Sequence, residues 1–301
     1  MQVQVQIRIK SKHSISSPFF REITNLRLNK MASVEVVGPK TVSLHSACES
    51  GNAERVQSLL VQKLKPEIDS LSLLSGKSPL HVACEKGYLT CVRLLLAHGA
   101  KPDITSYTGE TPLHLTCKVG DIECTRILLE YKADPNVFNM EEKTPLHVAC
   151  HQGNTECVFL LLQSKASIDK KGYKGRTPLY IACKYNRITC VRMLLEHGAD
   201  QFLETHKRAH TPLYIACKFD RVSCARMLME HHVYHHNSVQ VEGLPLFMAC
   251  SVGSVECIRL FQQLFRFNPI EIIHREKSAL GIAIDNEHWE CVRMLQEADW
   301  V

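Results

Sequence analysis

The spacing of the cysteines is the feature that most constrains the fold of this chain. Twelve of the 14 cysteines form six pairs whose members are seven residues apart. These pairs are Cys84/Cys91, Cys117/Cys124, Cys150/Cys157, Cys183/Cys190, Cys217/Cys224 and Cys250/Cys257. Successive pairs follow at 33 residues, with one step of 34, and Cys48 and Cys291 fit the same register. A period near 33 predicts stacked repeats rather than a single globular core.

Each central unit begins with a hydroxyl residue followed by proline. The run Ser78-Pro79-Leu80-His81 recurs as Thr111-Pro112-Leu113-His114 and as Thr144-Pro145-Leu146-His147. A hydroxyl side chain caps a helix N-terminus, and proline suits the first helical position. The helix is expected to end about nine residues later, at a residue that tolerates a left-handed backbone. Those end positions are Gly87, Gly120, Gly153, Asn186 and Asp220.

A second helix is predicted over residues 89–98, where Val92, Leu95 and Leu96 share one face and Gly99 ends the helix. A polar loop then leads to the next unit. Eight such units are expected, beginning at Val42, Ser78, Thr111, Thr144, Thr177, Thr211, Leu244 and Ser278.

These residues give the chain its resemblance to the ankyrin repeat family. The matching features are the Thr-Pro-Leu-His runs, the glycines between the helices and endings such as Glu196-His197-Gly198-Ala199-Asp200. The resemblance implies an all-α solenoid over residues 41–301, with projecting hairpin loops. It also implies a concave face of hairpin tips and first helices, and a protein-binding scaffold or adaptor with no catalysis and no cofactor.

Residues 1–40 lie outside the repeats and are expected to form a flexible basic arm. The first 30 residues carry a net charge of +5, equal to that of the whole chain, so the repeats are neutral overall. Three interpretations stay open: a mitochondrial targeting segment, an extension before a true start at Met31, and a disordered arm. No apolar run reaches the roughly 18 residues of a membrane span. We otherwise expect a monomer in the cytoplasm or nucleus.

The cysteines and histidines allow a second hypothesis, a redox- or metal-responsive sensor. Free cysteine is commonly a small buried residue, and a spacing of seven is not that of a zinc site, which favours core packing. Equivalent cysteines of adjacent units are expected about 10 Å apart, too far for a disulfide. The histidines His81, His114 and His147 are expected to tie turns together. The run His231–His236 is either a helix with paired histidines that could bind metal or, as we favour, a degenerate loop.

Residues 170–221 are the most basic part of the repeats, with eleven lysines and arginines against four acids. Basic and aromatic side chains at hairpin tips and first-helix ends suit a partner-binding surface, best matched by an acidic protein segment. Nucleic acid is a weaker candidate because the repeats are neutral overall. The predicted contact residues are Tyr107, Met140, His151, Tyr173, Lys174, Arg176, Lys184, Tyr185, His206, Lys207, Arg208, Lys218 and Phe219. The alternative is a merely solvated face. By the family resemblance, Asn136 matches a position where asparagine is hydroxylated.

Overall fold

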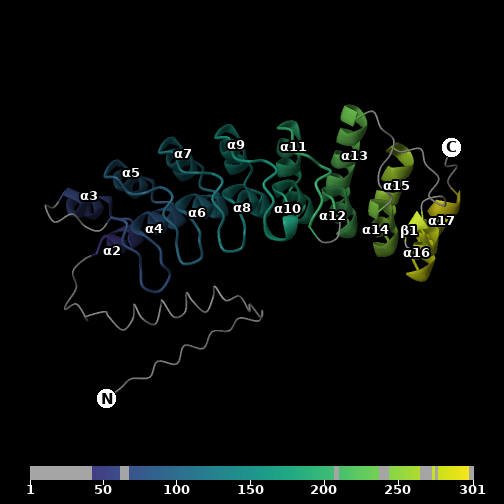
Figure 1. The fold of residues 1–301 in the computed structure, drawn as a ribbon, viewed down its shortest axis with the longest axis horizontal. Coiled ribbons are helices and arrows are strands. Elements are labelled where there is room, and N and C mark those ends of the chain that lie inside the picture. The colour runs from purple at the N-terminus through teal and green to yellow at the C-terminus, as the bar shows by residue number, and fades with distance from the viewer. Residues whose placement is uncertain are drawn as a thin grey trace, which may run out of the picture. The chain divides into compact units, whose positions relative to one another are not determined.

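The computed structural model describes residues 43–61, 68–206, 210–236, 244–264, 273–274 and 277–297. Within these ranges the chain forms successive helix pairs joined by loops (Figure 1). The predicted N-terminal arm, including Met31, lies outside the described residues, so its role and boundary stay predictions.

We number the repeats one to eight by their helix pairs. The first helices are α2 (Leu44–Glu49), α4 (Pro79–Lys86), α6 (Pro112–Val119), α8 (Pro145–Gln152), α10 (Pro178–Lys184), α12 (Pro212–Lys218), α14 (Leu244–Val252) and α16 (Ala279–Asp285). The second helices are α3 (Ala53–Val61), α5 (Leu89–Ala97), α7 (Ile122–Glu130), α9 (Thr155–Gln163), α11 (Ile188–Glu196), α13 (Val222–His236), α15 (Val255–Leu264) and α17 (Trp289–Glu297). A short turn of 3-10 helix, η1 (Tyr173–Gly175), forms one hairpin tip. The strands β1 (Ile273–His274) and β2 (Lys277–Ser278) pair antiparallel before α16.

The helix pairs stack in two rows. Each first helix contacts the first helix of the next repeat, and each second helix contacts the next second helix. The apolar core runs through both rows, and it includes Leu80, Leu113, Leu146 and Leu179, all with no exposed surface. All fourteen cysteines are free and buried within it. The expectation that they pack in the core is confirmed.

The predicted helix signals are confirmed at both ends. Ser78, Thr144 and Thr177 cap α4, α8 and α10 by accepting a backbone N–H through their side-chain oxygens. Gly87 ends α4 in the left-handed region, with φ of 71°. Asn186 takes the same role after α10, with φ of 56°.

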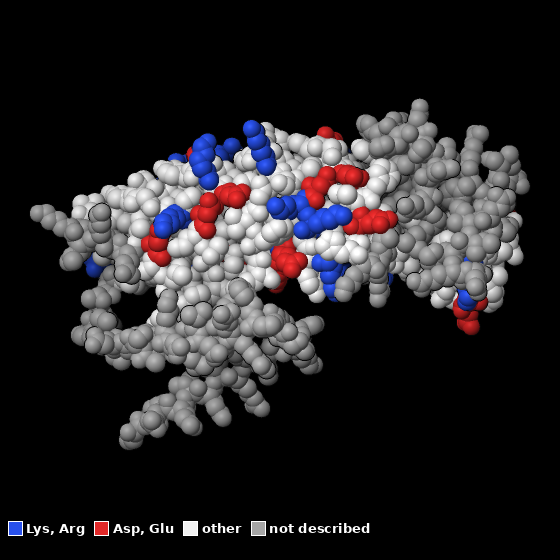
Figure 2. All heavy atoms as spheres, in the orientation of Figure 1, with Lys and Arg blue, Asp and Glu red and all other residues white. Residues whose placement is uncertain are grey.

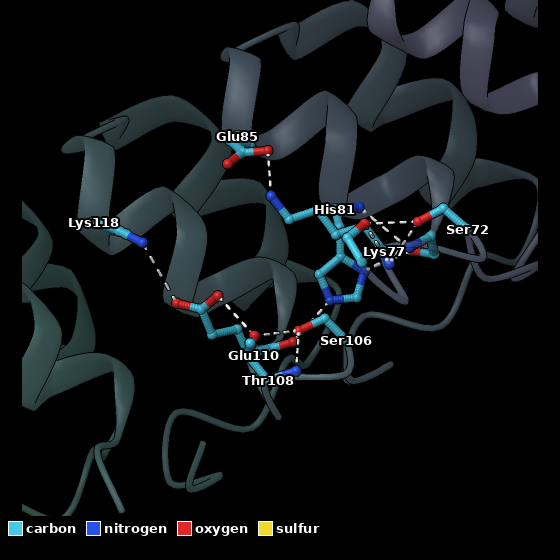
Figure 3. A network of polar contacts seen from close by, with 10 residues as sticks. Ser72, Lys77, His81, Glu85, Ser106, Thr108, Glu110 and Lys118 are labelled. Carbon is cyan, nitrogen blue, oxygen red and sulfur yellow. Dashed lines mark hydrogen bonds and ion pairs between the residues drawn. The ribbon is translucent and has the colours of Figure 1, made fainter. Parts of the chain in front are cut away.

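The histidines of the Pro-Leu-His runs tie each repeat to the next. The backbone N–H of Ser78 donates to Nδ1 of His81 at 3.1 Å, and Nε2 of His81 lies 2.8 Å from the carbonyl oxygen of Glu110 (Figure 3). Because Nδ1 accepts, the ring proton must lie on Nε2, which donates to that carbonyl. His114 and His147 bond the carbonyls of Lys143 and Arg176 in the same way. The expected structural role of these histidines is confirmed.

The expected loop at His231–His236 is wrong. The helix α13 continues through this run to His236. Neither glycine nor proline occurs in Val222–His236, so nothing in the backbone stops the helix. The side chains of residues 232–236 lie outside the described part of the structure, so the metal hypothesis for this run stays untested.

We predict that acid destabilises the fold through these histidines. Burial lowers the pKa of His81 and of His147 from 6.5 to about 4, so the neutral rings are the folded form. Their stabilisation is present above pH 6.5 and is lost as the pH falls towards 4, with an upper limit of about 3 kcal/mol for each ring. Urea unfolding over this range should show the loss.

The variant His147→Gln separates this effect from general acid unfolding. We expect it to be less stable at neutral pH by about 1–3 kcal/mol, because the contacts to Thr144 and Arg176 weaken. It should lose less stability on acidification than the wild type, because its amide does not titrate. Equal pH slopes in the two proteins would contradict the prediction.

Candidate functional site

Two positions recur in repeats two to six and eight, and we call them the register pair. The first is the residue before the N-cap of the first helix, and the second lies eight residues later at the end of that helix. In repeats two, three and eight these positions carry opposite charges and form ion pairs. The pairs are Lys77–Glu85 (Nζ to Oε2, 2.7 Å), Lys118–Glu110 (Nζ to Oε1, 3.7 Å) and Lys277–Asp285. The first two are drawn in Figure 3.

The register pairs of repeats four, five and six have no acid. They are Lys143/His151, Arg176/Lys184 and His210/Lys218. Lys143 pairs instead with Glu141, with Nζ 2.6 Å from Oε2. Within the described part of the chain, Arg176, Lys184 and Lys218 have no carboxylate partner. Three adjacent repeats therefore present basic groups at the positions where repeats two, three and eight hold ion pairs.

Aromatic rings lie beside these unpaired cations. Nζ of Lys184 is 5.0 Å from the ring centre of Tyr185 and 5.9 Å from that of Phe219 in the next repeat. The guanidinium of Arg176 lies 5.7 Å from the ring of Tyr180. Cations within about 6 Å of a ring are stabilised by the ring's quadrupole without being neutralised. They therefore keep their full charge for a partner.

His151 lies beside Tyr185, whose ring is also close to Nζ of Lys184. Its ring packs edge-on against Tyr185, with the ring centres 4.2 Å apart. Partial burial lowers its pKa, and the charges of Lys143, Arg187 and Lys184 lower it further. The ring is therefore neutral at neutral pH, and an anion bound nearby would favour its protonation.

The hairpin tips form a second row. Tyr107, Met140, Tyr173 and His206 follow one another at 33 residues. Backbone N–H groups tie three of the tips to the hairpin before them: Tyr107 donates to Ser75, Met140 to Thr108 and His206 to Lys174, at 2.9 to 3.2 Å. Tyr173 and Met140 are 52% and 42% exposed, large fractions for apolar side chains held in an ordered row.

The structure groups the predicted contact residues into these two rows. His151, Lys184, Tyr185, Lys218 and Phe219 lie at the first-helix ends, with Arg176 in a register pair. Lys174 lies with the tips, its Nζ 5.0 Å from the ring of Tyr173. Lys207 and Arg208 lie outside the described residues.

Sequence reasoning missed the rings of Tyr180 and Tyr214 and the ring of His210. The ring of His210 stacks on that of Tyr214, with their centres 3.8 Å apart, and Nζ of Lys218 lies 6.0 Å from the Tyr214 ring. Each of these contacts joins residues four apart on or just before a first helix, and that spacing was the signal that could have revealed them.

The excess of basic groups is concentrated in residues 170–221 and does not extend over all repeats. On the face drawn in Figure 2, lysine and arginine side chains are intermixed with aspartate and glutamate. This mixture agrees with the neutral net charge of the repeats. It is typical of a surface with locally paired charges rather than one that is uniformly basic.

Three further findings concern other kinds of site. Oδ1 of Asn136 accepts a hydrogen bond from the backbone N–H of Ser167 at 2.7 Å, and hydroxylation at this position stays a prediction. Among the described residues, no group of three or more His, Cys, Asp or Glu side chains is placed to hold a metal ion. In the same part of the chain, no helix combines the length and the apolar character needed to cross a membrane.

Comparison with known proteins agrees with this architecture. A family model described as ankyrin repeats (3 copies) matches residues 44–139, 100–172 and 136–205. The crystal structure of the human ASB11 ankyrin repeat domain is similar, with a TM-score of 0.62 and 28% sequence identity. The match covers 74% of this chain and 99% of that chain. No curated protein matches the chain.

We predict that the close contact between successive hairpin tips requires glycine at position 175. Gly175 has φ of 75°, and a Cβ there would lie 2.5 Å from Cδ2 and 2.7 Å from the backbone nitrogen of His206. Gly175→Ala should therefore cost about 1 kcal/mol of backbone strain and roughly 1–3 kcal/mol more for the clash. Gly198→Ala is the matched control, since φ there is 82° but nothing lies within 4 Å. Thermal unfolding should rank Gly175→Ala below Gly198→Ala; equal losses would contradict the clash.

Proposed function

Because the chain belongs to the ankyrin repeat family, whose repeats are generally protein-protein interaction modules, we propose that it is a non-catalytic scaffold or adaptor for an acidic protein segment. The proposed binding surface is formed by the basic register pairs of repeats four to six and the adjacent row of hairpin tips. We further propose that the protein binds as a monomer.

One observation carries this proposal. Arg176 and Lys184 are both cationic at the two positions where repeats two, three and eight hold an ion pair. A carboxylate from a partner would fill the place of the missing acid and would pair with cations that are already held over rings. Aromatic and arginine side chains are also the residue types that dominate binding hot spots.

The construction of the surface supports binding at low entropic cost. The backbone hydrogen bonds between tips and the contact of Lys184 with Phe219 hold side chains of adjacent repeats in place before a partner arrives. A preformed surface loses less conformational freedom on binding. The neutral charge of the repeats as a whole favours a protein partner over the nucleic-acid backbone, which is recognised through extended basic surfaces.

We predict that charge reversal at two register pairs abolishes partner capture. The variant Lys184→Glu/Lys218→Glu should lose proteins that the wild type captures from cells, because it repels carboxylates. For a captured protein, its affinity should fall by at least roughly tenfold, and the salt dependence of binding should flatten. Affinity capture followed by titration calorimetry measures both effects.

The matched control is Arg126→Glu/Arg259→Glu. It makes the same change in net charge on the second helices α7 and α15, where both arginines are about half exposed. We expect its captured proteins and affinities to equal those of the wild type. The same partners captured by the register-pair variant would place the binding site on another face.

We also predict that binding takes up a proton at His151. Anionic groups of the partner would offset Lys143 and Lys184, which lower the pKa of the free ring, so the pKa rises on binding. Affinity should therefore increase as the pH falls from about 7.5 to about 5.5, the range in which histidine titrates. His151→Gln should bind normally at the higher pH and lose this increase. An unchanged pH profile in the variant would show that another group is responsible.

A further inference from the structure

Two ladders of hydrogen bonds join the first five repeats. The first ladder is made by the histidines of the first helices, each of which bonds a backbone carbonyl in the loop before the next first helix. The bonds are 2.8 to 3.0 Å long and join His45 to Lys77, His81 to Glu110, His114 to Lys143 and His147 to Arg176. They cross all four boundaries between repeats one and five.

The second ladder lies in the loops that follow the second helices. There a side-chain Oδ1 atom accepts the backbone N–H of a residue in the corresponding loop of the next repeat. The bonds are 2.7 to 3.1 Å long and join Asp69 to Lys101, Asp103 to Asp134, Asn136 to Ser167 and Asp169 to Asp200. They cross the same four boundaries as the histidine bonds.

Neither ladder crosses the boundary between repeats five and six. Tyr180 replaces the histidine of the first ladder, and its buried ring lies 5.7 Å from the guanidinium of Arg176 in its own repeat. Phe202 stands 33 residues after Asp169, and its side chain has no atom that could accept an N–H. Within the described part of the chain, this boundary therefore lacks both bonds that each of the four earlier boundaries has.

A third contact between repeats is also missing at this boundary. Between repeats four and five, Nε of Arg187 donates to the carbonyl oxygen of His151 at 3.1 Å. Arg221 takes the same position one repeat later, but among the described residues its buried Nε has no hydrogen-bond partner.

The contacts that do cross this boundary are weaker than the two ladders. The helices α10 and α12 pack together, as do α11 and α13. Polar contacts include a side-chain bond of Gln201 to His231 at 3.3 Å and a bond from Sγ of Cys224 to Oδ1 of Asn186 at 3.4 Å. Both are longer than any bond of the ladders, and a thiol is a weak donor. The backbone bond from the tip at His206 has counterparts at earlier boundaries, so it does not compensate for the missing bonds.

We propose that the stack opens first at the boundary between repeats five and six, so that repeats six to eight unfold as a unit separate from repeats one to five. In a stack of repeats, stability is the sum of the terms for each repeat and each boundary, so the weakest boundary sets where the stack divides. One hydrogen bond changes such an equilibrium by a factor of roughly two to ten. The loss of two bonds therefore favours opening here by roughly tenfold or more.

This opening would control the basic surface described above. Lys184 belongs to repeat five, while Lys218 and Phe219 belong to repeat six. An acidic segment bound to both lysines would hold the boundary closed, and an open boundary would separate the two lysines. This consequence rests on the proposed function, whereas the opening itself requires no partner.

Hydrogen exchange of the full chain without a partner tests the opening. The protein is held at about pH 7.5, where histidine rings are neutral, in a series of sub-denaturing urea concentrations. Deuterium uptake is then measured on peptides by mass spectrometry. We expect a step in protection between α11 and α12, with the amides of α12 to α15 exchanging together and at least roughly tenfold faster than those of α4 to α11. Uniform exchange would overturn the proposal, and so would a gradual decline towards α17 without a step.

A variant that restores the missing histidine supplies a second test. In Tyr180→His the new ring could accept the N–H of Thr177 and donate to the carbonyl of His210. That carbonyl accepts the N–H of Thr205 at 3.2 Å, as the carbonyls of the first ladder accept theirs. We expect the exchange of α12 and α13 to slow by roughly two- to tenfold. Tyr180→Phe is the matched control, because it keeps the ring and adds no donor, and its exchange should equal or exceed that of the wild type.

The outcomes separate this proposal from the proposed function. Equal exchange in the two variants would show that the missing bond does not cause the opening and would overturn the proposal. The step in the wild type decides the matter alone if Tyr180→His does not fold. A step without any captured partner would support the opening and contradict the proposed function, and capture without a step would do the reverse.

Discussion

The apolar side chains of each repeat are buried by the neighbouring repeats, and the rest of the structure follows from that dependence. Two helices of about nine residues have too little apolar surface between them to form a core. Leu113 and Leu146 have no exposed surface because α6 and α8 pack against each other and against further repeats. Buried polar groups also depend on the neighbouring repeat, because the ring of His114 hydrogen-bonds the carbonyl oxygen of Lys143 in the next repeat. The repeat boundary is therefore where stability is concentrated.

The two positions of the register pair lie at the surface, so the packing between repeats does not require particular residues there. A partly exposed surface ion pair such as Lys77–Glu85 contributes only about 1 kcal/mol, so exchanging its acid for a base costs the stack little. The buried histidines and leucines have no such freedom. This difference explains how Arg176 and Lys184 can hold like charges while the helices beneath them keep the pattern of the other repeats. The residues at these surface positions can therefore be those that suit the binding of a partner, because the fold does not require particular residues there.

The sequence predicts the parts of this fold that depend on local backbone chemistry. Caps, helix ends and left-handed residues such as Asn186 are encoded within a few residues, and the structure confirms them. The helical run at His231–His236 was misjudged because the loss of a glycine was taken for the loss of the helix. The register pairs were missed for a different reason. They join the end of a loop to the end of a helix, and the period alone does not give those distances.

On the first helices, a residue that packs in the core can be followed directly by one that lies at the surface. Successive helical residues differ by about 100° around the axis, so Cys183 faces the core while Lys184 faces outward. The contact of Lys184 with Phe219 spans the boundary between α10 and α12, where these two first helices also pack against each other. A partner that bound both repeats would favour the closed boundary, and a closed boundary would favour the partner. Such linkage is reciprocal by thermodynamic necessity, so binding of the partner and closure of this boundary stabilise each other to the same extent.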